Sequence, residues 1–162
     1  MKEKVYEFLR EQGVEFEVCE HPATPTVELA RLYWDTSRPV QHCKNLFLRN
    51  HKGNRHYLVI IDSERTLDIQ GLARKIGDSR LSFASEARMM KYLGVTPGSV
   101  SVFGLLNDAT GSVRLLLDGK LRRDFPISFH PNDNTASLTI SHADFLRILP
   151  LLGNPYSFVD LD

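Results

Sequence analysis

The sequence is poor in the features that mark secreted, membrane-spanning or disulfide-rich proteins. Its 162 residues include two cysteines, Cys19 and Cys43, and without C-x-x-C spacing both are expected to stay free thiols in a reducing compartment. No stretch approaches the roughly 20 apolar residues that span a bilayer. Residues 1–4 begin an amphipathic pattern and not the apolar run of a signal peptide. A cytoplasmic protein without a membrane partner is therefore expected.

Signatures of cofactors and of common catalytic sites are missing as well. There is no P-loop and no G-x-G-x-x-G, so no nucleotide cofactor is expected. H-E-x-x-H is absent, and the spacing of His42, Cys43, His51 and His56 matches no common metal site, so no metal is expected either. The G-x-S-x-G elbow of α/β-hydrolases is also absent. A free cysteine is most often a small buried hydrophobe, and a nucleophilic Cys43 would need a base beside it.

Charge is balanced overall but unevenly distributed. The chain has 20 basic and 20 acidic side chains, so its total charge does not announce a nucleic-acid partner. Residues 36–61 nevertheless contain no acid, while they include Arg38, Lys44, Arg49, Lys52 and Arg55. This stretch fits either a limited contact with phosphate groups or a solvated hairpin with a chance cluster of charge.

Hydrophobic periodicity predicts alternating helices and strands. Helices are predicted at 4–12, from 26 through 32, and after the capping residues Asp68, Ser85 and Ser141. Strands are predicted at 14–19, 44–49, 56–61, 80–83, 113–117, 126–130 and 135–140, with a hairpin turn at 50–54. Gly104 inside the apolar run 100–106 indicates a bulge or a close backbone approach. The pattern indicates one α+β (mixed α/β) domain over residues 1–162.

Three local features carry chemistry, each with a plainer alternative. Lys44 and Asn45 open an apolar strand, as exposed residues or at the mouth of a cleft. Residues 98–101 form a small-residue loop, either a simple turn or a set of N–H groups facing an anion. His130 ends a strand before polar turn residues, where it is either structural or positions water. The sequence alone leaves these alternatives open.

Taken together, the motifs resemble the YbaK and prolyl-tRNA synthetase-associated domain family, in particular its ProX-type trans-editing members. The resemblance is carried by residues that stand in the expected order over nearly the whole chain: His21-Pro22, residues 44–48, 80–83, 93–100 and 103–105, Asn107-Asp108, and residues 129–131. Val102 stands where the G-x-x-x-P loop of the family has its proline, and residues 36–41 have no counterpart in the pattern.

The resemblance implies a curved, mainly antiparallel sheet flanked by helices, with a cleft for the aminoacylated 3′ end of tRNA. It makes Lys44 the functional lysine and Asn45 the residue that separates this subgroup from YbaK-type enzymes. Gly98 matches the first glycine of the family's loop, and His130 matches a histidine of a small amino-acid pocket. Further pocket residues are expected to be Leu46, Val100, Ser101, Phe103 and Phe129, and tRNA-binding residues Arg49, Lys52 and Arg55.

The reaction implied is hydrolysis of a mischarged tRNA for proline, with alanine as the amino acid. Backbone N–H groups near Gly98 and Ser99 are expected to face the oxyanion, and Lys44 to neutralise phosphate or carbonyl charge. The expected partners are aminoacylated tRNA(Pro) and, as a further candidate, prolyl-tRNA synthetase. The alternatives are another mischarged tRNA, such as Cys-tRNA(Pro), or a non-catalytic module that binds tRNA or a synthetase.

Overall fold

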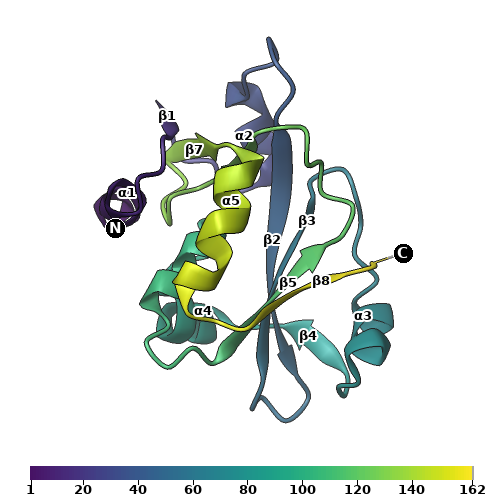
Figure 1. The fold of residues 1–162 in the computed structure, drawn as a ribbon. Helices are drawn as coiled ribbons and strands as arrows, with labels where there is room; N and C mark the ends of the chain where they lie inside the picture. The colour runs from purple at the N-terminus through teal and green to yellow at the C-terminus, as the bar shows by residue number, and fades with distance from the viewer. Residues whose placement is uncertain (162) are drawn as a thin grey trace.

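The computed structural model describes residues 1–161, and its central feature is a β-sheet with helices on both faces (Figure 1). Within these residues the sheet follows the order β1-β7-β6-β2-β3-β5-β8, and β4 pairs with β2. The strands are β1 (Glu17–Glu20), β2 (Gln41–Asn50), β3 (His56–Asp62), β4 (Leu81–Phe83), β5 (Val113–Asp118), β6 (Ile127–Phe129), β7 (Ala136–Ile140) and β8 (Tyr156–Val159). The long strand β2 pairs with β3, β4 and β6 and so organises the sheet.

The sheet is mixed. Pairing is antiparallel for β1–β7, β2–β3, β2–β4 and β6–β7, and parallel for β2–β6, β3–β5 and β5–β8. The mixed α/β class predicted from the sequence is confirmed. The predicted hairpin forms from β2 and β3, whose register places Lys44 opposite Ile61 and Arg49 opposite His56.

The helices begin where local capping chemistry predicts. They are α1 (Lys2–Glu11), α2 (Val27–Ala30), α3 (Ile69–Ile76), α4 (Glu86–Leu93), α5 (His142–Ile148) and the 3₁₀ helices η1 (Arg31–Tyr33), η2 (Val102–Asn107) and η3 (Leu149–Leu152). At each predicted cap a side-chain oxygen accepts the N–H three residues on, at 3.0 Å for Asp68, 3.2 Å for Ser85 and 3.1 Å for Ser141. In residues 1–161 no helix combines the length and the apolar character needed to cross a membrane.

Two apolar cores lie on opposite faces of the sheet, because side chains alternate along β2. Phe47 belongs to the larger core, which includes side chains of α1, α4, α5 and η2. Leu48 belongs to the smaller core, which α3 covers. In Figure 1, α4 and α5 accordingly lie on the opposite side of the sheet from α3. With both faces covered, residues 56–61 of β3 are all buried.

The structure differs from the sequence prediction at both ends of the sheet. Strand β1 begins at Glu17 and not at residue 14, because the N–H of Val14 donates to the carbonyl of Leu9 at 2.9 Å in the turn that ends α1. Strand β8 was not predicted. It pairs in parallel with β5, and its first three residues are exposed, so no alternation of burial marks it.

The apolar run after residue 100 forms the 3₁₀ helix η2. The close backbone approach predicted at Gly104 is confirmed, since a Cβ there would lie 3.0 Å from the Cβ of Leu93. This contact packs η2 against α4, and residues 102–105 are buried.

Candidate active site

One edge of β2 is unpaired in the middle of the sheet. On the side away from β3, residues 41–42 pair with β6 and residues 48–50 pair with β4. Within the described residues no strand pairs with residues 43–47 on that side. Strands β4 and β6 therefore leave a gap between them, with β2 as its floor.

Backbone groups of β2 point into this gap. The carbonyl of His42 accepts the N–H of Ser63 at 3.0 Å, so even-numbered residues of β2 bond towards β3. The carbonyl of Phe47 accepts the N–H of Ala84 at 2.9 Å on the opposite edge. Alternation along the strand consequently directs the N–H and the carbonyl of Asn45 into the gap.

A cavity of about 330 Å³ occupies this region. Its wall combines residues 42–47 of β2 with segments that are distant in the sequence. These are Thr24–Val27, Ala30 and Trp34 around α2; Phe83 and Met89 beside β4 and α4; Pro97, Gly98 and Val100; and Ser128–His130 with Ser137 on β6 and β7. The cavity thus collects side chains from most parts of the chain at one unpaired strand edge.

Lys44 and Asn45 approach the cavity from opposite faces of β2, because successive side chains of a strand alternate. The Nζ of Lys44 donates to the carbonyl of Arg65 at 2.7 Å, which fixes the ammonium group and leaves two of its N–H donors for a ligand. The Oδ1 of Asn45 is buried and has no hydrogen-bond partner within residues 1–161. A buried acceptor without a donor costs free energy, which a ligand with an N–H or O–H group would recover.

The residue whose carbonyl holds Lys44 is itself held by an ion pair with a buried carboxylate. The guanidinium of Arg65 binds the carboxylate of Asp118, which is fully buried. The other carboxylate oxygen of Asp118 accepts the N–H of Lys120 at 3.0 Å. The N–H of Arg65 donates to the carbonyl of Asp62 at 3.1 Å. Both side chain and backbone of Arg65 are therefore fixed, and with them the position of the Lys44 ammonium group.

Replacing Asp118 by alanine is expected to lower the free energy of unfolding by about 3 kcal/mol, because it removes a fully buried carboxylate together with its ion pair to Arg65 and its hydrogen bond from the N–H of Lys120. Urea unfolding of both proteins measures the difference. The matched control is Glu17→Ala, which breaks the exposed pair with Arg38 and should cost less than about 1 kcal/mol. Equal effects of the two substitutions would contradict the anchoring role of Asp118.

His130 lines the cavity as a neutral ring. Its Nδ1 lies 2.8 Å from the carbonyl oxygen of Ala136, so this nitrogen carries the proton and donates it. Burial lowers the pKa of His130, which keeps the ring uncharged near pH 7. The Nε2 atom is then left as an acceptor. The ring of His21 stands edge-on to it, with 6.2 Å between the centroids.

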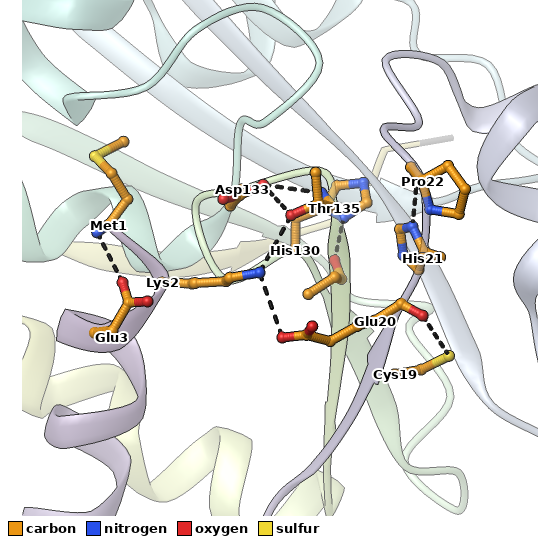
Figure 2. Close-up of polar contacts among 11 residues, drawn as sticks. Met1, Lys2, Glu3, Cys19, Glu20, His21, Pro22, His130, Asp133 and Thr135 are labelled. Carbon is orange, nitrogen blue, oxygen red and sulfur yellow. Dashed lines mark hydrogen bonds and ion pairs between the residues drawn. The ribbon is translucent and has the colours of Figure 1, made fainter.

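The turn that follows His130 is tied to the amino-terminal segment (Figure 2). The Nζ of Lys2 lies 3.3 Å from the hydroxyl of Thr135 and 3.4 Å from the carboxylate of Glu20. The carboxylate of Asp133 accepts both the N–H and the hydroxyl of Thr135, at 2.9 and 2.6 Å. These contacts fix the turn and so help to fix the orientation of His130.

The loop after residue 97 reaches the cavity through Gly98. Its φ is +85°, and a Cβ there would lie 2.8 Å from backbone atoms of Pro25, so only glycine fits. The expectation that the N–H of Ser99 faces an oxyanion is corrected, because this group donates to the carbonyl of Thr96 at 3.1 Å. The hydroxyl of Ser99 accepts the N–H of Asn134 at 3.2 Å and holds the turn described above.

Three of the five expected pocket residues, Leu46, Val100 and Phe129, line the cavity. Ser101 and Phe103 lie outside its wall. The hydroxyl of Ser101 caps η2 by accepting the N–H of Phe103 at 3.1 Å, and both side chains are fully buried. The ring of Phe103 packs edge-on against Phe129, with centroids 5.9 Å apart, in the core behind the cavity.

Val102 is the first residue of η2 and is fully buried. Its predecessor Ser101 has extended backbone angles and supplies the cap, so the turn into the helix is made by a side-chain hydrogen bond and not by a proline ring.

Sequence reasoning did not single out the wall formed around α2. The indole of Trp34 stacks on the ring of His42, with 3.7 Å between centroids and 7° between planes. Burial lowers the pKa of His42 to about 4, so this ring is neutral near pH 7. Arg31 pairs with Glu64 at 2.7 Å and ties the segment to the turn after β3. The hydroxyl of Thr26 caps α2, and this residue type allowed the start of the helix to be predicted from the sequence. The surface that α2 covers could not be predicted, because it depends on the whole fold.

Cys43 lines the cavity as a protonated thiol, since burial raises its pKa well above its usual value. Cys19 is exposed on β1. Among residues 1–161 no group of three or more histidine, cysteine or acidic side chains is placed to hold a metal ion.

The basic residues of the hairpin lie at the other end of β2. From Lys44 the strand continues for six residues, which is about 20 Å at 3.3 Å per residue. Arg49 donates to two carbonyls of the hairpin turn, at 3.2 and 3.0 Å, while Lys52 and Arg55 are exposed. None of the three side chains expected to bind tRNA lines the cavity.

Comparisons with known sequences agree with one another. Residues 21–148 match the family described as the aminoacyl-tRNA editing domain. The chain is 39% identical over 160 residues to the prolyl-tRNA editing protein ProX of Acetoanaerobium sticklandii, covering 99% of this chain and 97% of that protein. It is 27% identical to the multifunctional Ser/Thr-tRNA deacylase ProXp-y of Escherichia coli K12, covering 90% and 86% of the two chains.

Solved structures share the fold. A crystal structure described as that of a proposed trans-editing enzyme for prolyl tRNA synthetase has a TM-score of 0.71 at 22% identity, covering 99% of this chain and 96% of that one. The crystal structure of hypothetical protein APE2540 also has a TM-score of 0.71, at 20% identity, with 96% and 98% covered.

Proposed function

Because the chain belongs to the family of aminoacyl-tRNA editing domains, we propose that it is a trans-editing hydrolase that deacylates mischarged tRNA(Pro), with Ala-tRNA(Pro) as its substrate. The family match confirms the resemblance carried by the separate sequence motifs. The reaction is hydrolysis of the ester between the amino acid and the ribose of the 3′-terminal adenosine. Prolyl-tRNA synthetase is a candidate partner, since relatives from Bos taurus and Danio rerio are named prolyl-tRNA synthetase associated domain-containing protein 1.

The observation that carries this proposal is the composition of the cavity. One strand edge brings together a fixed ammonium group at Lys44, an unpartnered buried acceptor at Asn45 and a neutral imidazole at His130. The rest of the wall is largely apolar. Such a site suits a short amino acid esterified to a polar ribose: the apolar wall takes the side chain, and the polar groups take the ester and the ammonium end.

The polar groups can support ester hydrolysis without a protein nucleophile. An aminoacyl ester is already activated, so a positioned water and stabilisation of the tetrahedral oxyanion are sufficient. Lys44 supplies positive charge, and the N–H groups of Asn45 and Gly98 supply backbone donors at the cavity. The ribose hydroxyl next to the ester helps to orient the water.

A separate site for alanine has a physical reason. A synthetase pocket built for proline cannot strongly reject a smaller amino acid, because each missing methylene changes binding by only about 1–3 kcal/mol. A second enzyme that excludes proline by size removes the error and spares the correct product. In this chain Phe129, His130 and Val100 form the part of the wall that would set this limit.

The first test compares two substrates on one tRNA. Ala-tRNA(Pro) is expected to lose its amino acid in the presence of the protein, while Pro-tRNA(Pro) stays charged, because the part of the wall formed by Phe129, His130 and Val100 is expected to exclude the proline ring. Release of labelled amino acid over time measures both. Ser-tRNA and Cys-tRNA(Pro) belong in the same panel, since the E. coli relative is described as a Ser/Thr-tRNA deacylase.

Faster hydrolysis of Ser-tRNA or Cys-tRNA(Pro) than of Ala-tRNA(Pro) would reassign the substrate. Hydrolysis of none of them, with retained RNA binding, would favour the non-catalytic module.

A further inference from the structure

Two guanidinium groups converge beside the hairpin turn, outside the cavity. The position that a Cβ of Gly53 would occupy lies 2.7 Å from Nη2 of Arg88 and 3.1 Å from Nη2 of Arg49. Arg49 comes from β2 and Arg88 from α4, so distant parts of the chain place these two like charges together. Gly53 has a φ of +70° and no side chain, which leaves the space between them open.

Neutral partners hold both groups in place. Arg88 donates through Nη1 to the carbonyl of Gly53 at 3.0 Å and to Nε2 of His56 at 2.9 Å. Arg49 donates to the carbonyls of Asn50 and His51. Each guanidinium has five N–H donors, so three on each remain for a ligand in the described structure. Neither has a carboxylate partner within residues 1–161, and both positive charges therefore stay uncompensated.

The surroundings reinforce the positive charge. Because arginine is always the donor, His56 accepts through Nε2 and is neutral, and burial together with Arg88 and Arg49 lowers its pKa to about 4. Lys91, exposed on α4 with its ammonium group 5.2 Å from the Tyr92 ring, adds a third charge. The carboxylate of Asp108 acts against the lowering of the His56 pKa, but its Oδ2 already accepts from Val113 and Asn154.

The cluster is continuous with the cavity. Arg49 lies four residues beyond Asn45 on the same face of β2, about 13 Å away at 3.3 Å per residue. Phe47, between them, lines the cavity and stacks on His56 with centroids 5.6 Å apart. On α4, Arg88 directly precedes Met89, which also lines the cavity.

We propose that Arg49, Arg88 and Lys91 form a binding site for RNA phosphates, which holds the nucleotides just before the terminal adenosine while its ester occupies the cavity. This assignment rests on the proposed function for the identity of the RNA. Two fixed guanidinium groups with free donors match the geometry of phosphate oxygens. A strand that enters the cavity at its 3′ end carries one phosphate per nucleotide, so its last few phosphates lie within reach of a site about 13 Å away.

The structure separates this site from the rest of the hairpin. Lys52 is exposed at the turn. Arg55 lies on the opposite face, beside the hydroxyl of Tyr57 and the carboxylate of Asp78, which offsets its charge. Of the three hairpin residues expected to bind tRNA, Arg49 alone belongs to the convergent cluster.

Salt dependence of RNA binding tests the site. The probe is an uncharged, 5′-labelled RNA hairpin with an acceptor stem and a single-stranded CCA end, and fluorescence anisotropy gives Kd at several salt concentrations. For Arg49→Gln/Arg88→Gln the magnitude of the slope of log K against log salt should fall by about 1.4–1.8, roughly 0.7–0.9 for each lost phosphate contact. The matched control Lys52→Gln/Arg55→Gln removes the same charge from the hairpin and should keep the wild-type slope.

Lys91→Gln keeps the test decisive if the double variant does not fold. This side chain is exposed and its replacement leaves the packing intact, so a loss of about one in slope is expected. A wild-type slope in folded Arg49→Gln/Arg88→Gln, or an equal loss in the control variant, would overturn the assignment.

Because the probe carries no amino acid, the result does not depend on hydrolysis. A protein that binds RNA through this site but hydrolyses no ester refutes the deacylase and keeps the phosphate site. The opposite outcome is hydrolysis of the phosphate-free ester alanyl-adenosine by a protein whose RNA binding does not depend on these arginines. That result would support the deacylase and refute the phosphate site.

Discussion

Lys44→Ala is expected to reduce kcat/KM for Ala-tRNA(Pro) by about 10²–10³-fold, the usual effect of removing one group that stabilises an oxyanion. The reason is the fixed position of the ammonium group at the cavity, held by the Arg65 carbonyl with two donors to spare. The measurement is steady-state deacylation. Its two constants also separate two roles: a fall in kcat indicates contact with the oxyanion, whereas a rise in KM indicates uniform binding of a phosphate.

Two controls accompany Lys44→Ala. Arg74→Ala removes one positive charge from the exposed surface of α3, outside the cavity wall, and should leave the rate unchanged. Circular dichroism should show the same fold for both variants, since Lys44 contributes no side chain to either apolar core. A wild-type rate for Lys44→Ala would remove the ammonium group from the mechanism.

His130→Ala is expected to change the choice of substrate. Truncation removes an imidazole ring from the cavity wall, which frees more volume than the proline side chain needs beyond that of alanine. The enlarged cavity should hold alanine less well, with a loss of about 10- to 100-fold in kcat/KM, which lies within the range for one lost methylene contact. It should also admit larger esters, whose hydrolysis should increase. Measuring kcat/KM for an alanyl and for a bulkier ester on the same tRNA checks both effects.

A general base at this position would respond differently. The Nε2 of neutral His130 is an acceptor, so the geometry permits this role, and its loss would then slow both substrates by a similar factor, typically about 10²–10⁴. A uniform decrease would therefore indicate that His130 acts as a general base and does not set the size limit of the cavity. An unchanged rate on both substrates would leave His130 with a structural role through its bond to Ala136.

The sequence predicts those elements whose signals are local. The caps at Asp68, Ser85 and Ser141 and the β2–β3 hairpin are correct because each depends on residues within a few positions of one another. Strand β8 was missed because its partner β5 lies about forty residues earlier and its exposed side chains show no alternation of burial. Parallel pairing of this kind leaves no local mark.

The candidate site shows the same division. Lys44, Asn45 and His130 were found because each was predicted at a strand end, and the structure brings them to one cavity. For Lys44 and Asn45 the predicted position was wrong, since β2 begins at Gln41 and both residues lie inside the strand. Ser101 and Phe103 were placed with Gly98 because they are close in sequence, but η2 turns them into the core. The wall around Trp34 and His42 could not be predicted, because it exists only once β6 has paired with the start of β2.

The unpaired edge of β2 also bears on aggregation. Exposed strand edges recruit strands of other chains, and proteins usually protect them with charges, prolines or bulges. Here the open edge is interior and only five residues long, bounded by β6 at one end and by β4 at the other. Pro25 and Gly98 are packed together in the wall over it. An approaching strand therefore cannot align with it, and backbone groups remain available to a small ligand without forming a template for self-association.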